Sequence, residues 1–143
     1  MLRGPAKCKL ALIIAFFAFL IASARASAPE QARAKKEIMV EIGKVYAAMD
    51  QKMSIGVITT KFTDADYAEI AGQCDLLSRL ANDYAKAEGK AELSEIAKSL
   101  ATTADYLKQQ VDRKDPVVTA STYGRVLSYC AECHYETRWS AGK

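Results

Sequence analysis

One short segment near the end of the sequence combines residue types that bind metals and form covalent bonds. Cys130, Cys133 and His134 form a C-x-x-C-H motif, and His134 is the single histidine of the chain. On a helix, Cys130 and His134 are one turn apart and Cys133 projects close to both. Two thioether bonds can therefore tether a porphyrin edge while the imidazole reaches its iron. This is the attachment signature of c-type haem, so the motif predicts one covalently bound haem with His134 as an axial ligand of the iron.

The same residues permit other chemistry. A disulfide between Cys130 and Cys133 is compatible with an oxidising compartment, and a haem-free helical adaptor carrying that disulfide is an alternative. A thioredoxin-type pair requires a βαβ setting, and the sequence predicts no strand. A structural zinc site needs four ligands and would have to use every cysteine and the single histidine of the chain beyond the N-terminal segment. Haem is the interpretation that we favour.

The elements that must position this motif are helices. A first helical stretch runs from about Glu30 to Ser54, because apolar residues recur at spacings of three and four. The members of this stripe are Ile38, Ile42, Val45, Met49 and Met53. A second, adjoining line contains Lys35, Met39, Gly43 and Tyr46. The segment from Ile55 to Phe62 is expected to interrupt the helix.

Three further helices follow. Thr63 is the expected N-cap of the second helix, with Asp66 three residues later, and that helix ends near Lys86. The third helix is expected from about Ala91 to Val111. Asp115 and Pro116 supply an N-cap and a first helical residue for the fourth helix, which runs to about Trp139. Four amphipathic helices with short joins predict an all-α fold, an antiparallel four-helix bundle with the haem attached near the C-terminus of the last helix.

The first 26 residues have the layout of a secretory signal peptide. A basic start precedes the unbroken apolar run Leu10–Ala22, and small residues follow it. The rival interpretation is a membrane anchor, but thirteen residues span only roughly 20 Å of a hydrocarbon core about 30 Å thick. Cleavage is expected before Ser27, with a second candidate site after Ala24. Residues 27–143 would then form one periplasmic domain without stable membrane insertion, and Cys8 would be absent from it.

The net charge and the motifs of the sequence argue against several classes of function. From Ser27 onward the chain carries 16 basic and 17 acidic residues, a net charge of about −1. A nearly neutral domain has no electrostatic basis for binding nucleic acid. No phosphate-binding glycine loop and no catalytic Ser/His/Asp set is present, so we do not expect an enzyme.

A C-x-x-C-H motif close to the C-terminus, helices throughout and an export segment together resemble the class II c-type cytochromes, the cytochrome c-prime family. The resemblance covers about Glu30 to Lys143. It rests on the haem motif, on Arg138 four residues after the histidine, and on Met39-Val-Glu-Ile42-Gly43 in the first helix. It implies a four-helix bundle, Cys130 and Cys133 as haem anchors, and His134 as the proximal ligand.

The resemblance also suggests the second axial ligand. Low-spin members of the family carry M-x-x-I-G in the first helix and bind iron through its methionine, and Met39 fits that position. Met49 and Met53 are further candidates, and an open or water-bound iron is the main alternative. Lys35 stands where the family often places an arginine near a haem propionate. Thr137 stands where the family usually has an aromatic residue.

The second ligand separates two functions. With Met39 on the iron, the haem is six-coordinate and low-spin, which suits electron transfer to redox partner proteins. With an open iron, the protein would resemble the high-spin branch of the family and bind nitric oxide or carbon monoxide. The resemblance also implies a possible homodimer through the first two helices. Cys74, outside the motif, is expected to be a small buried residue of the second helix.

Overall fold

The structure, a computed structural model, describes residues 34–56, 58, 59 and 61–138. The expected signal segment and Trp139 lie outside the described residues, as does Cys8. The chain divides into two compact units, Met1–Ala34 and Lys35–Lys143, and every described residue except Ala34 belongs to the second unit.

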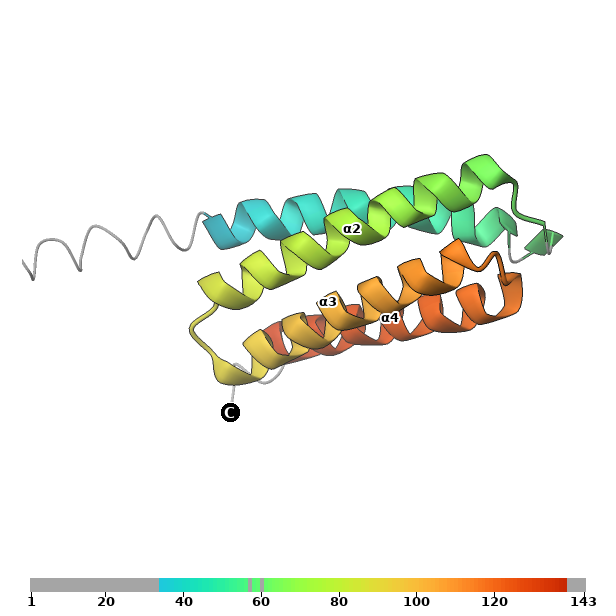
Figure 1. The fold of residues 1–143 in the computed structure, drawn as a ribbon. Helices are drawn as coiled ribbons and strands as arrows, with labels where there is room; N and C mark the ends of the chain where they lie inside the picture. The colour runs from blue at the N-terminus through green and yellow to red at the C-terminus, as the bar shows by residue number, and fades with distance from the viewer. Residues whose placement is uncertain (1–33, 57, 60, 139–143) are drawn as a thin grey trace, which may run out of the picture. The chain divides into compact units, whose positions relative to one another are not determined.

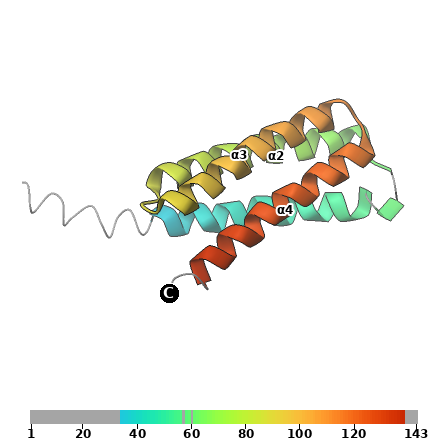
Figure 2. The same cartoon turned by 90° about the horizontal axis from the view of Figure 1, so that it is seen from below.

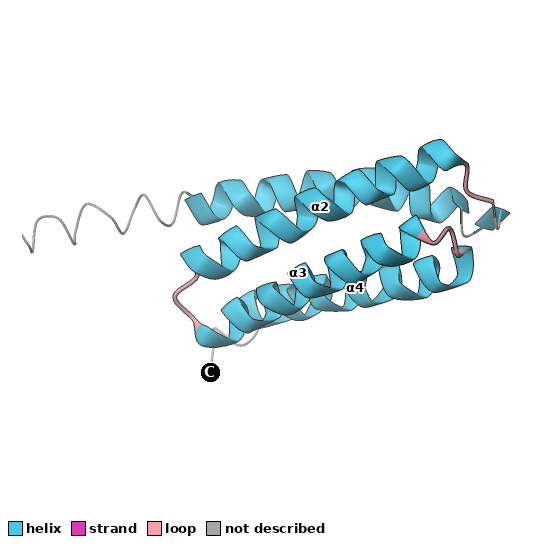
Figure 3. Cartoon of the chain, in the orientation of Figure 1, coloured by secondary structure: helices cyan, strands magenta, loops and turns pink. Residues whose placement is uncertain are grey.

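Throughout the described ranges the chain forms helices joined by loops, without a strand (Figure 3). The first helix covers residues 34–56, and residues 58 and 59 are also helical. It is followed by α2 (Asp64–Ala87), α3 (Ala91–Asp112) and α4 (Pro116–Arg138). The prediction of an all-helical protein with four helices is therefore confirmed for this part of the chain.

The expected interruption after Ser54 was placed too early. Residues 55 and 56 continue the first helix, and residues 58 and 59 are helical again. At Gly56 the ring of Phe62 lies so close that a Cβ atom at this position would overlap the ring. Glycine here therefore allows an aromatic ring to approach the helix.

Successive helices pack side by side within the second unit. α2 packs against α3 and α3 packs against α4, while the first helix lies along α2 and α4 (Figures 1 and 2). The joins at residues 88–90 and 113–115 are short, so that neighbouring helices run in opposite directions. Buried residues from all four helices share one core, including Met49, Ile70, Leu107 and Val126. This arrangement is the predicted bundle.

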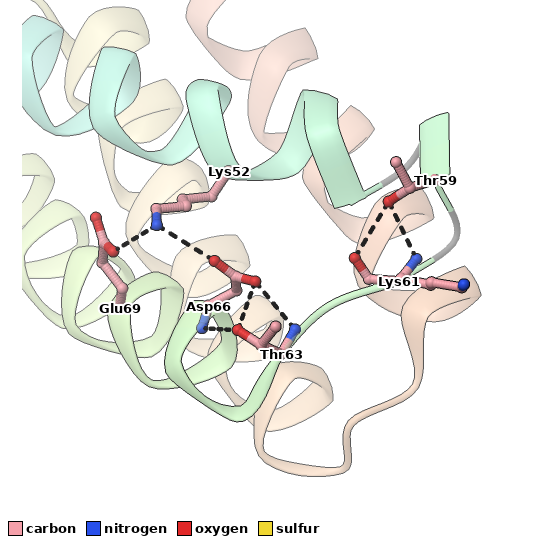
Figure 4. A network of polar contacts seen from close by, with 6 residues as sticks. All are labelled: Lys52, Thr59, Lys61, Thr63, Asp66 and Glu69. Atoms are coloured by element: carbon pink, nitrogen blue, oxygen red, sulfur yellow. Dashed lines mark hydrogen bonds and ion pairs between the residues drawn. The ribbon is translucent and has the colours of Figure 1, made fainter.

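Polar contacts fix where α2 begins (Figure 4). The Thr63 hydroxyl accepts the N–H of Asp66 at 3.1 Å, and the Asp66 carboxylate accepts the N–H of Thr63 at 3.0 Å. This is a capping box, in which two otherwise unpaired N–H groups are satisfied reciprocally. Lys52 of the first helix extends the network to Asp66 and Glu69 at 3.2 and 3.0 Å. One cation thereby ties the first helix to the first turns of α2.

The loop before this cap is shaped by a threonine. The Thr59 hydroxyl donates to the carbonyl of Ile55 at 2.8 Å. It also accepts the N–H of Lys61 at 3.4 Å (Figure 4). The loop therefore carries some of its own hydrogen bonds between the end of the first helix and the N-cap of α2.

The last helix begins as its sequence predicts. The Asp115 carboxylate accepts the N–H groups of Val117 and Val118, both at 3.0 Å, and Pro116 occupies the first helical position. The preceding Lys114 has a φ of 56° in the left-handed region, which allows the tight reversal between α3 and α4. Of the helices that the structure describes, none is long and apolar enough to cross a membrane.

Candidate functional site

A cavity of about 360 Å³ opens between the four helices. It lies at the end of the bundle where the first helix begins, α2 ends, α3 begins and α4 ends. Its wall is made mainly of apolar side chains. The lining residues are Met39, Ile42, Gly43, Tyr46, Ala81, Tyr84, Ile96, Ala97, Leu100, Leu127, Cys130, Ala131, Cys133 and His134. The volume lies within the usual range for sites that hold a small molecule or cofactor.

The cavity brings together the residues that the sequence singled out for chemistry. Cys130, Cys133 and His134 contribute from α4, and Met39 contributes from the first helix. Cys133 is 9% exposed, Cys130 is half-buried and His134 is exposed. A thioether sulfur and an imidazole thus reach one apolar space from two different helices, next to two thiols.

The other predicted residues lie elsewhere. Met49 and Met53 are each 1% exposed in the core and do not line the cavity. Lys35 is paired with Glu88 at 3.4 Å and is not a lining residue. Arg138 is the exposed last residue of α4 and is also absent from the cavity wall. Of the three methionines on the first helix, only Met39 is therefore placed at the cavity.

The first helix presents one narrow face to the cavity. Met39, Gly43 and Tyr46 follow one another at spacings of four and three residues, which places them on the same side of a helix. A Cβ atom added at Gly43 would meet no other atom within 4 Å. The glycine thus adds no side chain to the cavity wall one turn from Met39.

Thr137 stabilises the turn that carries the motif. Its hydroxyl lies 3.0 Å from the carbonyl oxygens of both Cys133 and His134, to which it donates. This back-bonding is a known role of threonine on helices. The residue that departs from the family pattern therefore contacts the backbone of the motif itself.

The two motif cysteines are free thiols in the structure, as is Cys74. Burial raises the pKa of Cys130, with a smaller effect of Cys133. Burial also raises the pKa of Cys133, and the negative charges of Glu88 and Glu132 add to the shift. Thiol–disulfide catalysts lower the pKa of their attacking cysteine, so these shifts are in the opposite direction. Cys74 is fully buried on α2, as expected, and burial raises its pKa to about 12.

Two tyrosines give the cavity its polar margin. Tyr84 lines it and donates its hydroxyl to Glu88 Oε2 at 2.9 Å. Burial and this hydrogen bond raise the pKa of Tyr84. Tyr46 also lines the cavity, and the hydroxyl of the buried Tyr123 beside it donates to Asp50 Oδ1 at 2.8 Å. Burial, followed by Asp50, raises the pKa of Tyr123. The phenols of Tyr84 and Tyr123 therefore remain protonated hydrogen-bond donors at neutral pH.

Sequence reasoning did not single out Glu88, which lies between the expected second and third helices. Acidic residues in a turn are normally solvated, so nothing in the local sequence marked this one. Its contacts to Lys35 and Tyr84 depend on packing between helices. The cavity-facing side of α3 contains Ile96 and Leu100, which are four residues apart and so lie on one face of the helix.

The residues present fit a c-type haem. Two cysteines for thioether bonds, an imidazole four residues after the first cysteine, and a thioether facing from another helix all border one apolar cavity. Gly43 is part of the same wall and contributes no side chain to it. Among the residues that the structure describes, no three His, Cys, Asp or Glu side chains gather to hold a metal ion.

No protein-family model, curated protein or solved structure matches this chain.

Proposed function

We propose that this protein is a monohaem c-type cytochrome of the class II kind that carries electrons between redox partner proteins. Cys130 and Cys133 would anchor the haem, and His134 and Met39 would be the two axial ligands of its iron. The observation that supports this most directly is that Met39 shares one cavity with the C-x-x-C-H residues. These positions lie far apart in the sequence, and only folding brings them together.

The bound haem would supply one-electron chemistry, cycling between Fe(II) and Fe(III). The chain's own contribution is to fix both axial ligands and to surround them with apolar side chains such as Ile42 and Leu100. A thioether ligand favours the reduced state, and ligation that is the same in both states keeps structural change small. Tyr84 also lines the cavity, and its hydroxyl is held by its hydrogen bond to Glu88.

Optical spectra of the purified protein, oxidised and reduced, with and without carbon monoxide, test this proposal. We expect a sharp low-spin spectrum on reduction and no response to the gas. The colour should survive denaturation and acid–acetone extraction in the wild-type protein and in Cys74→Ala, and be lost from the double variant Cys130→Ala/Cys133→Ala. No haem absorption in wild-type protein from a host that attaches haem would refute the proposal.

One observation favours a second candidate function, the binding of nitric oxide or carbon monoxide. The space at Gly43 lies one turn from Met39, so a small ligand has room beside the thioether. In that case the iron would be five-coordinate and Met39 would be a packing residue. A broad high-spin spectrum that shifts when carbon monoxide is added would favour this function over electron transfer.

We further propose that residues 1–26 direct export and that residues 27–143 act in the periplasm. The basic start and the apolar run Leu10–Ala22 support this. The test is N-terminal sequencing of the haem-containing protein from a periplasmic fraction, which should begin at Ser27. Recovery of the intact chain from the membrane fraction would favour an uncleaved anchor.

A further inference from the structure

Glu88 is a buried carboxylate in the turn between α2 and α3, with a side chain that is 6% exposed. Its Oε1 atom accepts the N–H groups of Gly89 and Lys90 at 2.9 and 3.1 Å. Its Oε2 atom accepts the Tyr84 hydroxyl at 2.9 Å and the Lys35 ammonium at 3.4 Å. Every contact to this carboxylate is a donor, so the geometry holds it as an anion.

The contacts place this anion beside the cavity. Tyr84 donates to Glu88 and lines the cavity together with Cys133 and His134. The Glu88 carboxylate is therefore a single hydrogen bond away from a side chain of the cavity wall.

The positive charge of Lys35 does not cancel the negative charge of Glu88. Lys35 has a side chain that is 31% exposed, against 6% for Glu88. Water therefore screens the ammonium more strongly than the carboxylate. The Glu88 carboxylate is thus the less screened charge of the pair.

We propose that Glu88 is a positioning residue for redox function, a built-in negative charge that stabilises the more positive ferric state and lowers the reduction potential of the haem iron. This inference rests on the proposed function, because it concerns the potential of the haem that Cys130 and Cys133 would hold. Lys35 partly offsets the charge of the Glu88 carboxylate and so raises the reduction potential. Tyr84 fixes the distance of the carboxylate from the cavity wall.

The test is a spectroelectrochemical titration of the haem-loaded protein in four forms: wild type, Glu88→Gln, Lys35→Gln and Glu69→Gln. Glu69 is a matched control, because it lies near the start of α2, at the end opposite to Glu88, and also pairs with a lysine, Lys52, at 3.0 Å. We expect Glu88→Gln to raise the potential and Lys35→Gln to lower it. The shift in Glu88→Gln should persist at high salt, since a buried charge is poorly screened, whereas any shift in Glu69→Gln should disappear.

The inference would be overturned if the reduction potentials of Glu88→Gln and Lys35→Gln both equalled that of Glu69→Gln. It would also be overturned if the potentials of Glu88→Gln and Lys35→Gln shifted in the same direction, or if high salt abolished the shift in Glu88→Gln. If Glu88→Gln fails to attach haem, Lys35→Gln decides, with a lowered potential in support and an unchanged one against. If the wild-type protein carries no haem, the proposed function itself fails and takes this inference with it.

Discussion

Three methionines share the first helix but meet different surroundings. Met49 and Met53 are surrounded by core side chains, while Met39 borders the cavity that His134 also borders. Their sulfur atoms have the same intrinsic chemistry, so placement decides which of them can serve as a ligand. A substitution series along this helix therefore separates ligation from packing.

We expect Met39→Ala to convert a low-spin haem to a high-spin one and to allow carbon monoxide to bind, because the second axial position is vacated. The matched variant Met49→Ala should keep the low-spin spectrum while losing about 2–5 kcal/mol of stability, since it leaves a cavity in the core. Optical spectroscopy and chemical unfolding measure the two effects. A low-spin spectrum in Met39→Ala would assign the ligand to another residue.

The hydroxyl groups of a buried and an exposed tyrosine, Tyr123 and Tyr106, should contribute differently to stability. Tyr123→Phe removes the hydroxyl that donates to Asp50 at 2.8 Å and leaves a half-buried carboxylate without that donor. We expect a loss of about 1–3 kcal/mol in the free energy of unfolding. The control Tyr106→Phe, at a side chain that is 44% exposed, should change it by less than about 0.5 kcal/mol. Equal losses in both variants would contradict a specific role for this hydrogen bond.

At the scale of whole helices, the start of α2 depends on an ionised carboxylate. The side-chain and backbone hydrogen bonds of Thr63, followed by that of Lys52, lower the pKa of Asp66 from 3.8 to about 2. A carboxyl group whose pKa is depressed by folding stabilises the native state above its unfolded pKa. That contribution is lost as the pH falls through the folded value.

We therefore expect wild-type stability to fall between about pH 4 and pH 2 in a step that Asp66→Asn lacks. Thr63→Ala should shrink the same step, because it removes the largest cause of the shift, and Thr63→Ser should restore it. Urea unfolding at a series of pH values measures all four proteins. An unchanged step in Asp66→Asn would show that other carboxyl groups produce it.

The helices were predictable to the extent that their signals are local. Thr63 with Asp66, and Asp115 with Pro116, marked two helix starts correctly because a cap involves residues within one turn of each other. The end of the first helix was placed about two residues too early, because the segment from Ile55 to Phe62 was expected to interrupt the helix as a whole. The contact between Gly56 and Phe62 forms only after the chain turns back. Within the site, the motif and Met39 were found from spacing and family resemblance, whereas Glu88 required knowledge of which helix ends meet.

At the scale of the molecule, the cavity is a space that all four helices leave between them. Gly43 borders it, whereas Gly72 on α2 is an exposed position away from it, and an added Cβ meets no atom within 4 Å at either glycine. Leucine in place of either glycine raises helix propensity by up to about 1 kcal/mol. A longer side chain at position 43 would enter the cavity, whereas one at position 72 would not.

We expect Gly43→Leu to reduce haem content and to disturb the low-spin spectrum, because its side chain would occupy the cavity. Gly72→Leu should retain full haem content and match or exceed the wild type in thermal stability. The ratio of haem absorbance to protein concentration, measured after export from the same host, gives the result. Equal haem content in the two variants would place the haem outside this cavity.

The cavity joins residues from the first helix with residues from the last, and this has a consequence for how the protein folds. α2 with α3, and α3 with α4, can pair through short turns as soon as each is made, whereas Met39 meets the motif only when nearly the whole described chain has closed on itself. Contacts between distant segments form late, because the entropy of closing a long loop must be lost first. The site would therefore be the last part of the bundle to assemble, and during synthesis the motif cysteines leave the ribosome after most of their future neighbours.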